Sequence, residues 1–329
     1  MTKCFTKIYL KCDGRANVNP KDGDIIMKNV AVIGAGTMGH SLAMVFAGKY
    51  HVHLNDIHPS ALDTAKRLIR SNLNTLYRAE LIPDIQSIED KITYETNLEN
   101  AVEDADLIVE TISENAQAKK DLFSKLGELS KRESIIASNT SYLNIFQLLD
   151  PRKLKHAVIA HWYNPPHILP IVEIVPGPET PAKTVQTVTG VLKQLGKEPV
   201  VLKKFIPGFI GNRLQAAMNL EVYHLLDSNL AEMKDIDKVA KYSFGLRLPV
   251  LGILARHDFT GLDLVQAVLK NKSYQPPKVR GKCKAIDALV RQNRLGVKSG
   301  KGFYDYGSQS IEALTSERDL KLLKILALV

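Results

Sequence analysis

The chain has 329 residues, of which 45% are hydrophobic and 24% are charged. This balance is that of a globular protein long enough for two domains, and it excludes wholesale disorder and low-complexity or collagen-like architecture. Lysine and arginine exceed aspartate and glutamate by 9, and residues 269–301 alone carry ten basic residues against one acid, Asp287. Such a stretch attracts polyanions, including phosphorylated cofactors or substrates, although a solvated helix face is the simpler alternative.

The sequence contains no signal for a membrane or a metal. No apolar run approaches the roughly 18 residues of a membrane span, and no signal-peptide pattern follows the first lysines, so we expect no membrane partner. The three cysteines, Cys4, Cys12 and Cys283, are widely scattered. This pattern is typical of free thiols in a reducing cytoplasm and does not fit a disulfide framework or a zinc site.

Secondary-structure patterns become clear after a polar N-terminal extension, residues 1–27. The predicted strands are 29–33, 51–55, 106–111, 134–138, 157–162 and 171–175, and the first predicted helices are 41–48 and 59–77. Strands that alternate with helices favour an α/β fold with a parallel, doubly wound sheet of the Rossmann type. We assign this domain to residues 28–206.

The pattern changes near residue 206, where the strand signals stop. Helical periodicity at 208–227, 233–242, 262–269 and 284–291 predicts a second, all-helical domain over residues 207–308. Residues 311–329 predict one amphipathic helix that could pack on a neighbour, so we assign 309–329 to a helical tail.

A glycine-rich turn follows the first predicted strand and opens a helix. Gly34 permits the tight turn, Gly36 lets the backbone approach a pyrophosphate, and Gly39 allows the helix to pack closely on the strand. Thr37 and Met38 complete the turn, and Met38 can line the cofactor cleft. The N-terminus of the helix then offers its amides and its positive dipole end to the phosphates.

The cofactor preference depends on Asp56, which closes the second predicted strand 22 residues after Gly34. A carboxylate at this point accepts hydrogen bonds from the adenosine ribose hydroxyls and repels a 2′-phosphate. Ile57 follows it, where an arginine would suit NADP. The sequence therefore predicts NAD as the cofactor.

An acid–base pair is predicted from His161, at the end of one strand, and Glu173, on the next apolar run. The carboxylate can hold one imidazole nitrogen and leave the other to exchange a proton with a substrate hydroxyl near neutral pH. Oxidation of an alcohol by NAD needs such a base. The alternative is a structural histidine with satisfied hydrogen bonds.

Several motifs occur together and in order along the chain. They are Gly34-Ala-Gly36-Thr-Met-Gly39, Glu114-Asn115, Ser138-Asn-Thr-Ser141, His161-x-x-Asn164-Pro, Glu173, Pro207-Gly-Phe-Ile-x-Asn212-Arg213 and Gly300-Lys-Gly-Phe-Tyr304. With these motifs the sequence resembles the L-3-hydroxyacyl-CoA dehydrogenase family over residues 28 to about 306. The resemblance implies an NAD-dependent oxidoreductase of fatty-acid and lipid metabolism that forms homodimers through its helical domain.

The resemblance also implies roles for single residues. His161 matches the general acid–base of the family and Glu173 its orienting partner, while Ser141 and Asn212 match side chains beside the reacting oxygen. The positions that match contacts to NAD are Glu114, Lys119, Asn164 and Lys298. Several of these residues also have a purely structural alternative, because serine, glutamate and asparagine commonly cap helices or satisfy turns.

The substrate is left open between two groups of relatives. The double proline after Asn164, the Pro178-Glu-Thr sequence and Arg247, which could pair with a free carboxylate, resemble dehydrogenases of free 3-hydroxy acids such as L-gulonate (the lambda-crystallin type) or carnitine. Asn72 and Ala79 stand where the family has a serine and a lysine that contact CoA.

Other features resemble the relatives that use CoA. These are Gly261-Leu-Asp263, the sequence from Gly300 to Tyr306 and the basic stretch. We expect a short-chain L-3-hydroxyacyl-CoA as substrate, with a free 3-hydroxy acid as the alternative. A non-catalytic, crystallin-like NAD-binding protein is a more distant alternative. A nucleic-acid partner is not expected, because no basic groove interleaved with aromatic residues is evident.

Overall fold

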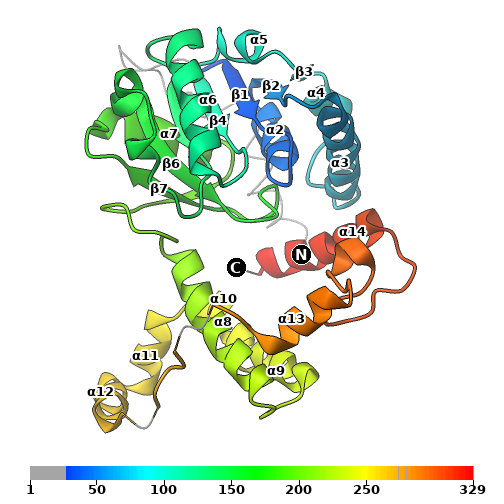
Figure 1. Cartoon of the computed structure of the whole chain (residues 1–329), viewed down its shortest axis with the longest axis vertical. Coiled ribbons are helices and arrows are strands. Elements are labelled where there is room, and N and C mark those ends of the chain that lie inside the picture. Colours follow the sequence, from blue (N-terminus) through cyan, green and yellow to red (C-terminus); the bar gives the residue numbers. More distant parts are fainter. Residues whose placement is uncertain (1–26, 273, 279–280, 329) are drawn as a thin grey trace. The chain divides into compact units, whose positions relative to one another are not determined.

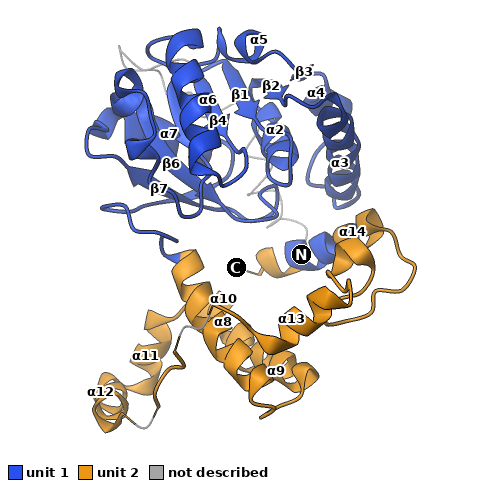
Figure 2. Ribbon diagram, viewed as in Figure 1, with its two compact units in different colours: residues 1–210, 316–323 blue, residues 211–315, 324–329 orange. Residues whose placement is uncertain are grey.

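The computed structural model of the chain describes residues 27–272, 274–278 and 281–328. They divide into two compact units, which Figure 2 colours separately. Unit 1 holds the described residues up to Ile210 together with 316–323, and unit 2 holds 211–315 and the residues from 324 onward. The expected N-terminal extension lies outside the described residues apart from Met27. The predicted domain limits of 28–206, 207–308 and 309–329 stay predictions. The division into compact units places the change from unit 1 to unit 2 after Ile210.

Unit 1 is built on one eight-stranded sheet with the strand order β3-β2-β1-β4-β5-β6-β7-β8 (Figure 1). Its strands are β1 (Asn29–Ile33), β2 (His51–Asn55), β3 (Ile92–Glu95), β4 (Leu107–Glu110), β5 (Ile135–Ser138), β6 (Ala157–Trp162), β7 (Ile171–Pro176) and β8 (Glu198–Val201). The α/β, doubly wound architecture is therefore confirmed. The sequence patterns did not predict the two edge strands, β3 and β8.

The predicted parallel order of the sheet holds except at one pair. Strands β6 and β7 run antiparallel, and His161 lies directly opposite Glu173 in their register. Only residues 163–170 connect the two strands. A parallel pair needs a crossover of about a dozen residues or more, so this short connection forces the chain to turn back.

Helices cover both faces of the sheet. The helices of unit 1 are α2 (Gly39–Ala47), α3 (Pro59–Arg78), α4 (Gln86–Glu89), α5 (Leu98–Val102), α6 (Ala116–Leu129) and α7 (Ala182–Gln194). Ile33 of β1 shares a buried cluster with Phe123 of α6, whereas Val32 points to the other face and is also fully buried. Phe46 of α2 packs against Trp162 of β6, with ring centroids 5.8 Å apart. The long apolar runs of the strands follow from this two-sided burial.

The described residues of unit 2 form helices and the loops between them, with two isolated bridges near residue 301. Its helices are α8 (Gly211–Asp227), α9 (Met233–Ala240), α10 (Leu246–Leu251), α11 (Leu254–Thr260), α12 (Leu262–Asn271), α13 (Lys284–Arg291) and the flanking parts of α14 (Ile311–Leu326). The predicted second, all-helical domain is confirmed in its fold class. Within the described ranges, none of the helices has both the length and the apolar character that crossing a membrane requires.

The middle of α14 packs in unit 1. Asp319 is buried, and its Oδ2 lies 3.2 Å from Nε2 of His167. One turn earlier, the hydroxyls of Ser316 and Thr75 share a hydrogen bond of 2.9 Å. The predicted tail is thus a helix, and polar contacts join its residues 316–323 to α3 and to the loop that contains His167.

Candidate active site

The candidate site residues of unit 1 gather at one edge of the sheet. Strands β1, β2, β4, β5 and β6 are parallel, so their carboxyl ends lie along the same edge. Gly34 follows β1, Asp56 follows β2, Glu110 ends β4, Ser138 ends β5 and His161 is the last residue but one of β6. Ligands of doubly wound sheets bind at this edge.

The glycine turn has the shape that a pyrophosphate needs. Gly34 has φ +100°, and a Cβ on Gly39 would lie 1.7 Å from the carbonyl oxygen of Gly34, so neither position accepts a side chain without a backbone shift. A Cβ on Gly36 would meet nothing within 4 Å, which leaves open space beside this part of the backbone. Helix α2 begins at this open space, without a side-chain cap from Met38. Its first amides are therefore available to an anion.

The carboxylate of Asp56 is tied to the same turn. Its Oδ2 accepts a hydrogen bond of 2.9 Å from the amide of Ala35, and its Oδ1 accepts one of 3.0 Å from the amide of His58. Each oxygen has a second lone pair for a ribose hydroxyl. The residues present therefore fit NAD, whose pyrophosphate the turn at Gly36 would hold and whose adenosine ribose Asp56 would bind.

His40 supports the turn from within α2. Its Nδ1 lies 2.9 Å from the carbonyl oxygen of Gly36 and its Nε2 3.1 Å from the hydroxyl of Ser41. Burial lowers the pKa of His40, against the opposing effect of the Gly36 carbonyl. A neutral imidazole with its proton on Nδ1 can donate to that carbonyl and hold the turn in place.

His161 and Glu173 form a buried pair across β6 and β7. Nδ1 of His161 lies 2.9 Å from Oε2 of Glu173, and both residues are 3% exposed. Because the two residues are paired directly across the strands, their side chains lie on the same face of the sheet. On its other side, Nε2 of His161 lies 3.4 Å from the hydroxyl oxygen of Ser141.

The segment that leads into α8 packs against this pair. The amide of Gly208 donates to the carbonyl oxygen of Ser141 at 3.1 Å, and the amide of Ile210 donates to Oε1 of Glu173 at 2.8 Å. Between them the buried ring of Phe209 lies 5.1 Å from the imidazole of His161, centroid to centroid. Three consecutive residues thus contact three parts of the site.

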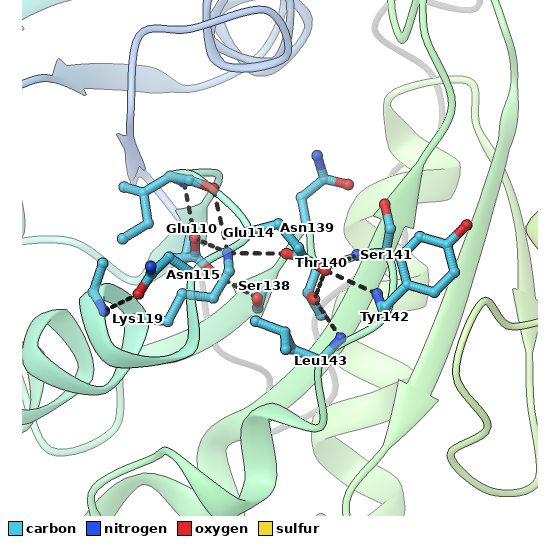
Figure 3. Close-up of polar contacts among 12 residues, drawn as sticks. Glu110, Glu114, Asn115, Lys119, Ser138, Asn139, Thr140, Ser141, Tyr142 and Leu143 are labelled. Atoms are coloured by element: carbon cyan, nitrogen blue, oxygen red, sulfur yellow. Dashed lines mark hydrogen bonds and ion pairs between the residues drawn. The ribbon is translucent and has the colours of Figure 1, made fainter. Parts of the chain in front are cut away.

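A second polar network fixes the loop that carries Ser141 (Figure 3). Glu114 accepts three hydrogen bonds on Oε1, from the hydroxyl of Thr140 at 2.7 Å and from the amides of Ser141 and Tyr142 at 2.9 Å each. Because these donors are consecutive, a single carboxylate oxygen holds the turn after β5. The position of the Ser141 hydroxyl depends on this turn.

Lys119 of α6 joins Glu114 to the end of β4. Its ammonium lies 2.5 Å from Oε1 of Glu110 and 3.8 Å from Oε2 of Glu114, and its side chain is fully buried. The hydroxyl of Ser138 donates to the other oxygen of Glu110 at 2.5 Å. Burial alone would raise the pKa of the Glu114 carboxyl, but its hydrogen-bond donors and the charge of Lys119 together hold that pKa below its usual range.

The remaining predicted residues are distributed over both units. Asn164 is exposed and is the second residue after β6. Asn212 is the second residue of α8 and is half-buried, and the guanidinium of Arg247 donates to Ser243 one turn earlier on its own helical segment. Lys298 lines a cavity of about 530 Å³ within unit 2. The catalytic, cofactor and substrate roles of all predicted residues stay predictions.

Two polar residues of the site were missed in the sequence. Glu110 is an acid at the end of an otherwise apolar, buried strand, and this mismatch is a signal that could have identified it. Tyr163 donates to Glu173 at 2.7 Å, but it stands in the sequence as an ordinary aromatic residue. The described ranges contain no group of three histidine, cysteine or acidic residues that could hold a metal ion.

Comparison with known proteins identifies the family. The model of the 3-hydroxyacyl-CoA dehydrogenase NAD-binding domain matches residues 29–205, and that of the 3-hydroxyacyl-CoA dehydrogenase C-terminal domain matches residues 208–306. The chain belongs to the 3-hydroxyacyl-CoA dehydrogenase family. It is an NAD-dependent dehydrogenase, as its glycine turn and Asp56 predict.

The relatives within this family carry different names. A 5-formyl-3-hydroxy-2-methylpyridine 4-carboxylate 5-dehydrogenase of Mesorhizobium japonicum is 31% identical over 309 residues, which are 91% of this chain and 97% of the relative. A probable 3-hydroxybutyryl-CoA dehydrogenase of Deinococcus radiodurans is 34% identical over 84% of this chain and 99% of its own. A crystal structure of the pyridine-carboxylic acid dehydrogenase, described as an NAD⁺-dependent dismutase, has a TM-score of 0.81 at 29% identity, covering 92% and 98% of the two chains.

Alanine substitutions at Gly36 and Gly39 should separate cofactor binding from folding. In Gly36→Ala the added methyl group occupies the open space of the turn, so we expect a wild-type melting temperature with NADH affinity lower by about tenfold or more. In Gly39→Ala the methyl group meets backbone, so we expect a loss of about 2 kcal/mol in the free energy of unfolding. Thermal melts and NADH fluorescence titration measure both quantities. Unchanged NADH affinity in Gly36→Ala would contradict the assigned pyrophosphate position.

Proposed function

We propose that this dehydrogenase interconverts a 3-hydroxyacyl compound and its 3-keto form, with His161 as the general acid–base and Glu173 as its partner. The observation that carries the proposal is the buried contact of 2.9 Å between Nδ1 of His161 and Oε2 of Glu173. An ionised carboxylate only accepts hydrogen bonds, so it keeps a proton on Nδ1 and leaves Nε2 as the atom that exchanges a proton with substrate.

The proton transfer follows from this arrangement. In the reductive direction Nε2 of His161 gives its proton to the substrate oxygen, and in the oxidative direction it removes the hydroxyl proton. Bound NAD supplies the hydride donor and acceptor. The hydroxyl of Ser141, 3.4 Å from Nε2, is close enough to hydrogen-bond the same substrate oxygen. The charge of Glu173 stabilises the imidazolium that forms during oxidation.

For the substrate we favour a short-chain L-3-hydroxyacyl-CoA. The family membership supports this choice, as do the relatives named 3-hydroxybutyryl-CoA dehydrogenase. Helix α3 also carries exposed cations, Lys66, Arg67 and Arg78, which would attract the phosphates of CoA. With this substrate the chain would take part in fatty-acid metabolism, and its scattered cysteines support a cytoplasmic location.

A free 3-hydroxy acid is the second candidate, and two observations favour it. Asn72, which stands where the family has a CoA-contacting serine, is buried and donates to the hydroxyl of Ser41 at 3.3 Å. Ala79, at the position of the CoA-contacting lysine, offers no charge. The Mesorhizobium relative is named for a substrate with a free carboxylate, which Arg247 could pair with in this chain.

We also propose that the chain forms a homodimer through unit 2. Large apolar side chains of α10, α11 and α12 are strongly exposed in the single chain. Val250 and Phe259 are each 81% exposed, and Leu254 is 77% exposed. Several large apolar side chains exposed on successive helices are typical of protein–protein interfaces.

Replacement of His161 tests the proposed acid–base. We expect His161→Ala to lower kcat by about 100- to 10,000-fold, because proton transfer is lost, with the Kd for NADH unchanged. His51→Ala, which removes an exposed histidine of β2, is the matched control and should keep full turnover. Steady-state rates and NADH fluorescence give the two readouts. Wild-type turnover in His161→Ala would falsify the assignment.

A substrate panel separates the two candidates. We expect NADH oxidation with acetoacetyl-CoA to exceed that with acetoacetate or 3-dehydrocarnitine, and Arg247→Leu to leave the acetoacetyl-CoA rate within about twofold of wild type. If the free keto acids are preferred and Arg247→Leu raises their KM by about tenfold or more, the substrate has a bare carboxylate and the CoA proposal is wrong.

The dimer is tested by a charge in the exposed apolar surface. We expect sedimentation equilibrium to give twice the chain mass of 36.5 kDa for the wild type and a shift toward one chain mass for Val250→Asp, because burying a lone carboxylate is costly. Asn229→Asp adds the same charge at an exposed turn of unit 2 and should leave the dimer intact. A wild-type chain that sediments as a monomer would contradict the proposal.

A further inference from the structure

Tyr163 contributes a third polar group to the His161–Glu173 pair. Its hydroxyl donates a hydrogen bond of 2.7 Å to Oε2 of Glu173, which is the same oxygen that Nδ1 of His161 contacts at 2.9 Å. The other oxygen of this carboxylate accepts the amide of Ile210 at 2.8 Å. A single buried carboxylate is therefore in hydrogen-bond contact with three donors.

Tyr163 is the first residue after β6, directly beyond Trp162, which packs against Phe46. From there Tyr163 reaches the oxygen of Glu173 that the imidazole of His161 also contacts. Its ring also lies edge-on to His161, with centroids 4.7 Å apart and an interplanar angle of 66°.

The shared oxygen has an electrostatic consequence. A hydroxyl that donates to a carboxylate draws off part of its negative charge, and less of that charge then stabilises a neighbouring imidazolium. Other groups that face the imidazole include the hydroxyl of Ser141 and the apolar ring of Phe209. The Glu114 carboxylate accepts a hydrogen bond from the amide of Ser141, the residue whose hydroxyl contacts the imidazole. The hydroxyl of Tyr163 acts on the same oxygen of Glu173 that contacts the imidazole, whereas the amide of Ile210 acts on the other oxygen.

We propose that Tyr163 is a positioning residue which, through Glu173, sets the pH range over which His161 exchanges its proton with substrate. This inference rests on the proposed role of His161. Without the hydroxyl, the full carboxylate charge acts on the imidazolium, and His161 holds its proton to higher pH. The oxidative direction needs the neutral imidazole and loses rate near neutral pH, whereas the reductive direction needs the imidazolium and keeps its rate to higher pH.

The test is the pH profile of kcat for Tyr163→Phe in both directions. The substitution keeps the ring that packs on His161 and removes the hydroxyl alone. We expect the midpoints of both profiles to move up by about one pH unit, since a hydrogen bond to a charged group is worth about that much, with the KM for NADH unchanged. Tyr50→Phe is the matched control, because it removes a hydroxyl that donates to Gln194 at 2.9 Å elsewhere in unit 1. Its midpoints should equal those of the wild type.

A purely structural role for Tyr163 predicts a different result. Loss of packing would lower kcat at every pH and leave the midpoints where they are in the wild type, and this outcome overturns the proposal. A midpoint shift of the same size in Tyr50→Phe overturns it as well, because the effect would then not depend on Glu173.

A titration without substrate distinguishes this inference from the proposed function. The imidazole signal of His161, assigned by its loss in His161→Gln, is followed by NMR against pH in the wild type and in Tyr163→Phe. We expect the midpoint of this signal to rise by about one pH unit in the variant. An unmoved midpoint overturns the inference, whatever the enzyme turns over. A moved midpoint together with full turnover in His161→Ala overturns the proposed function instead.

Discussion

The buried carboxylate of Glu173 is the group on which the described site depends. It is 3% exposed, and it accepts His161 and Tyr163 on one oxygen and the amide of Ile210 on the other. An ionised carboxylate removed from water is strongly destabilising unless such donors compensate it. The donors come from two separate segments, residues 161–163 and Ile210, and the antiparallel pairing of β6 with β7 places His161 directly opposite Glu173. The single break in the parallel order of the sheet thus creates the position of the acid–base pair.

Much of the fold could be predicted because burial on both faces gives long apolar runs, as in β1, β4 and β6. The edge strands escaped prediction for the opposite reason, since β8 is largely exposed and contains Pro199, and β3 has one buried residue. The contact between His161 and Glu173 could be predicted, because the two residues lie on consecutive predicted strands and consecutive strands are often neighbours in a sheet. The hydroxyl of Tyr163 could not, since Tyr163 stands in the sequence as an ordinary aromatic residue, whereas Glu110 was missed although an acid ends an otherwise apolar strand.

The chain of charges from Glu110 through Lys119 to Glu114 explains how a fully buried lysine can serve a ligand site. Removing either acid would leave a buried ammonium with too few partners, so the three side chains are stable only as a set. Their joint effect reaches Ser141, because Glu114 holds the backbone of that residue. The end of β4, the start of α6 and the loop after β5 therefore keep one fixed geometry beside the imidazole.

Residues 208–210 bind the site through consecutive positions, by an amide on the Ser141 carbonyl, a ring on His161 and an amide on Glu173. Phe209 adopts φ +49° to do so, a left-handed conformation that an aromatic side chain seldom takes. Inserting or deleting one residue here would displace the two amides and the ring from their partners by the length of one residue. The number of residues in this segment is therefore set by the spacing between the Ser141 carbonyl and the Glu173 carboxylate.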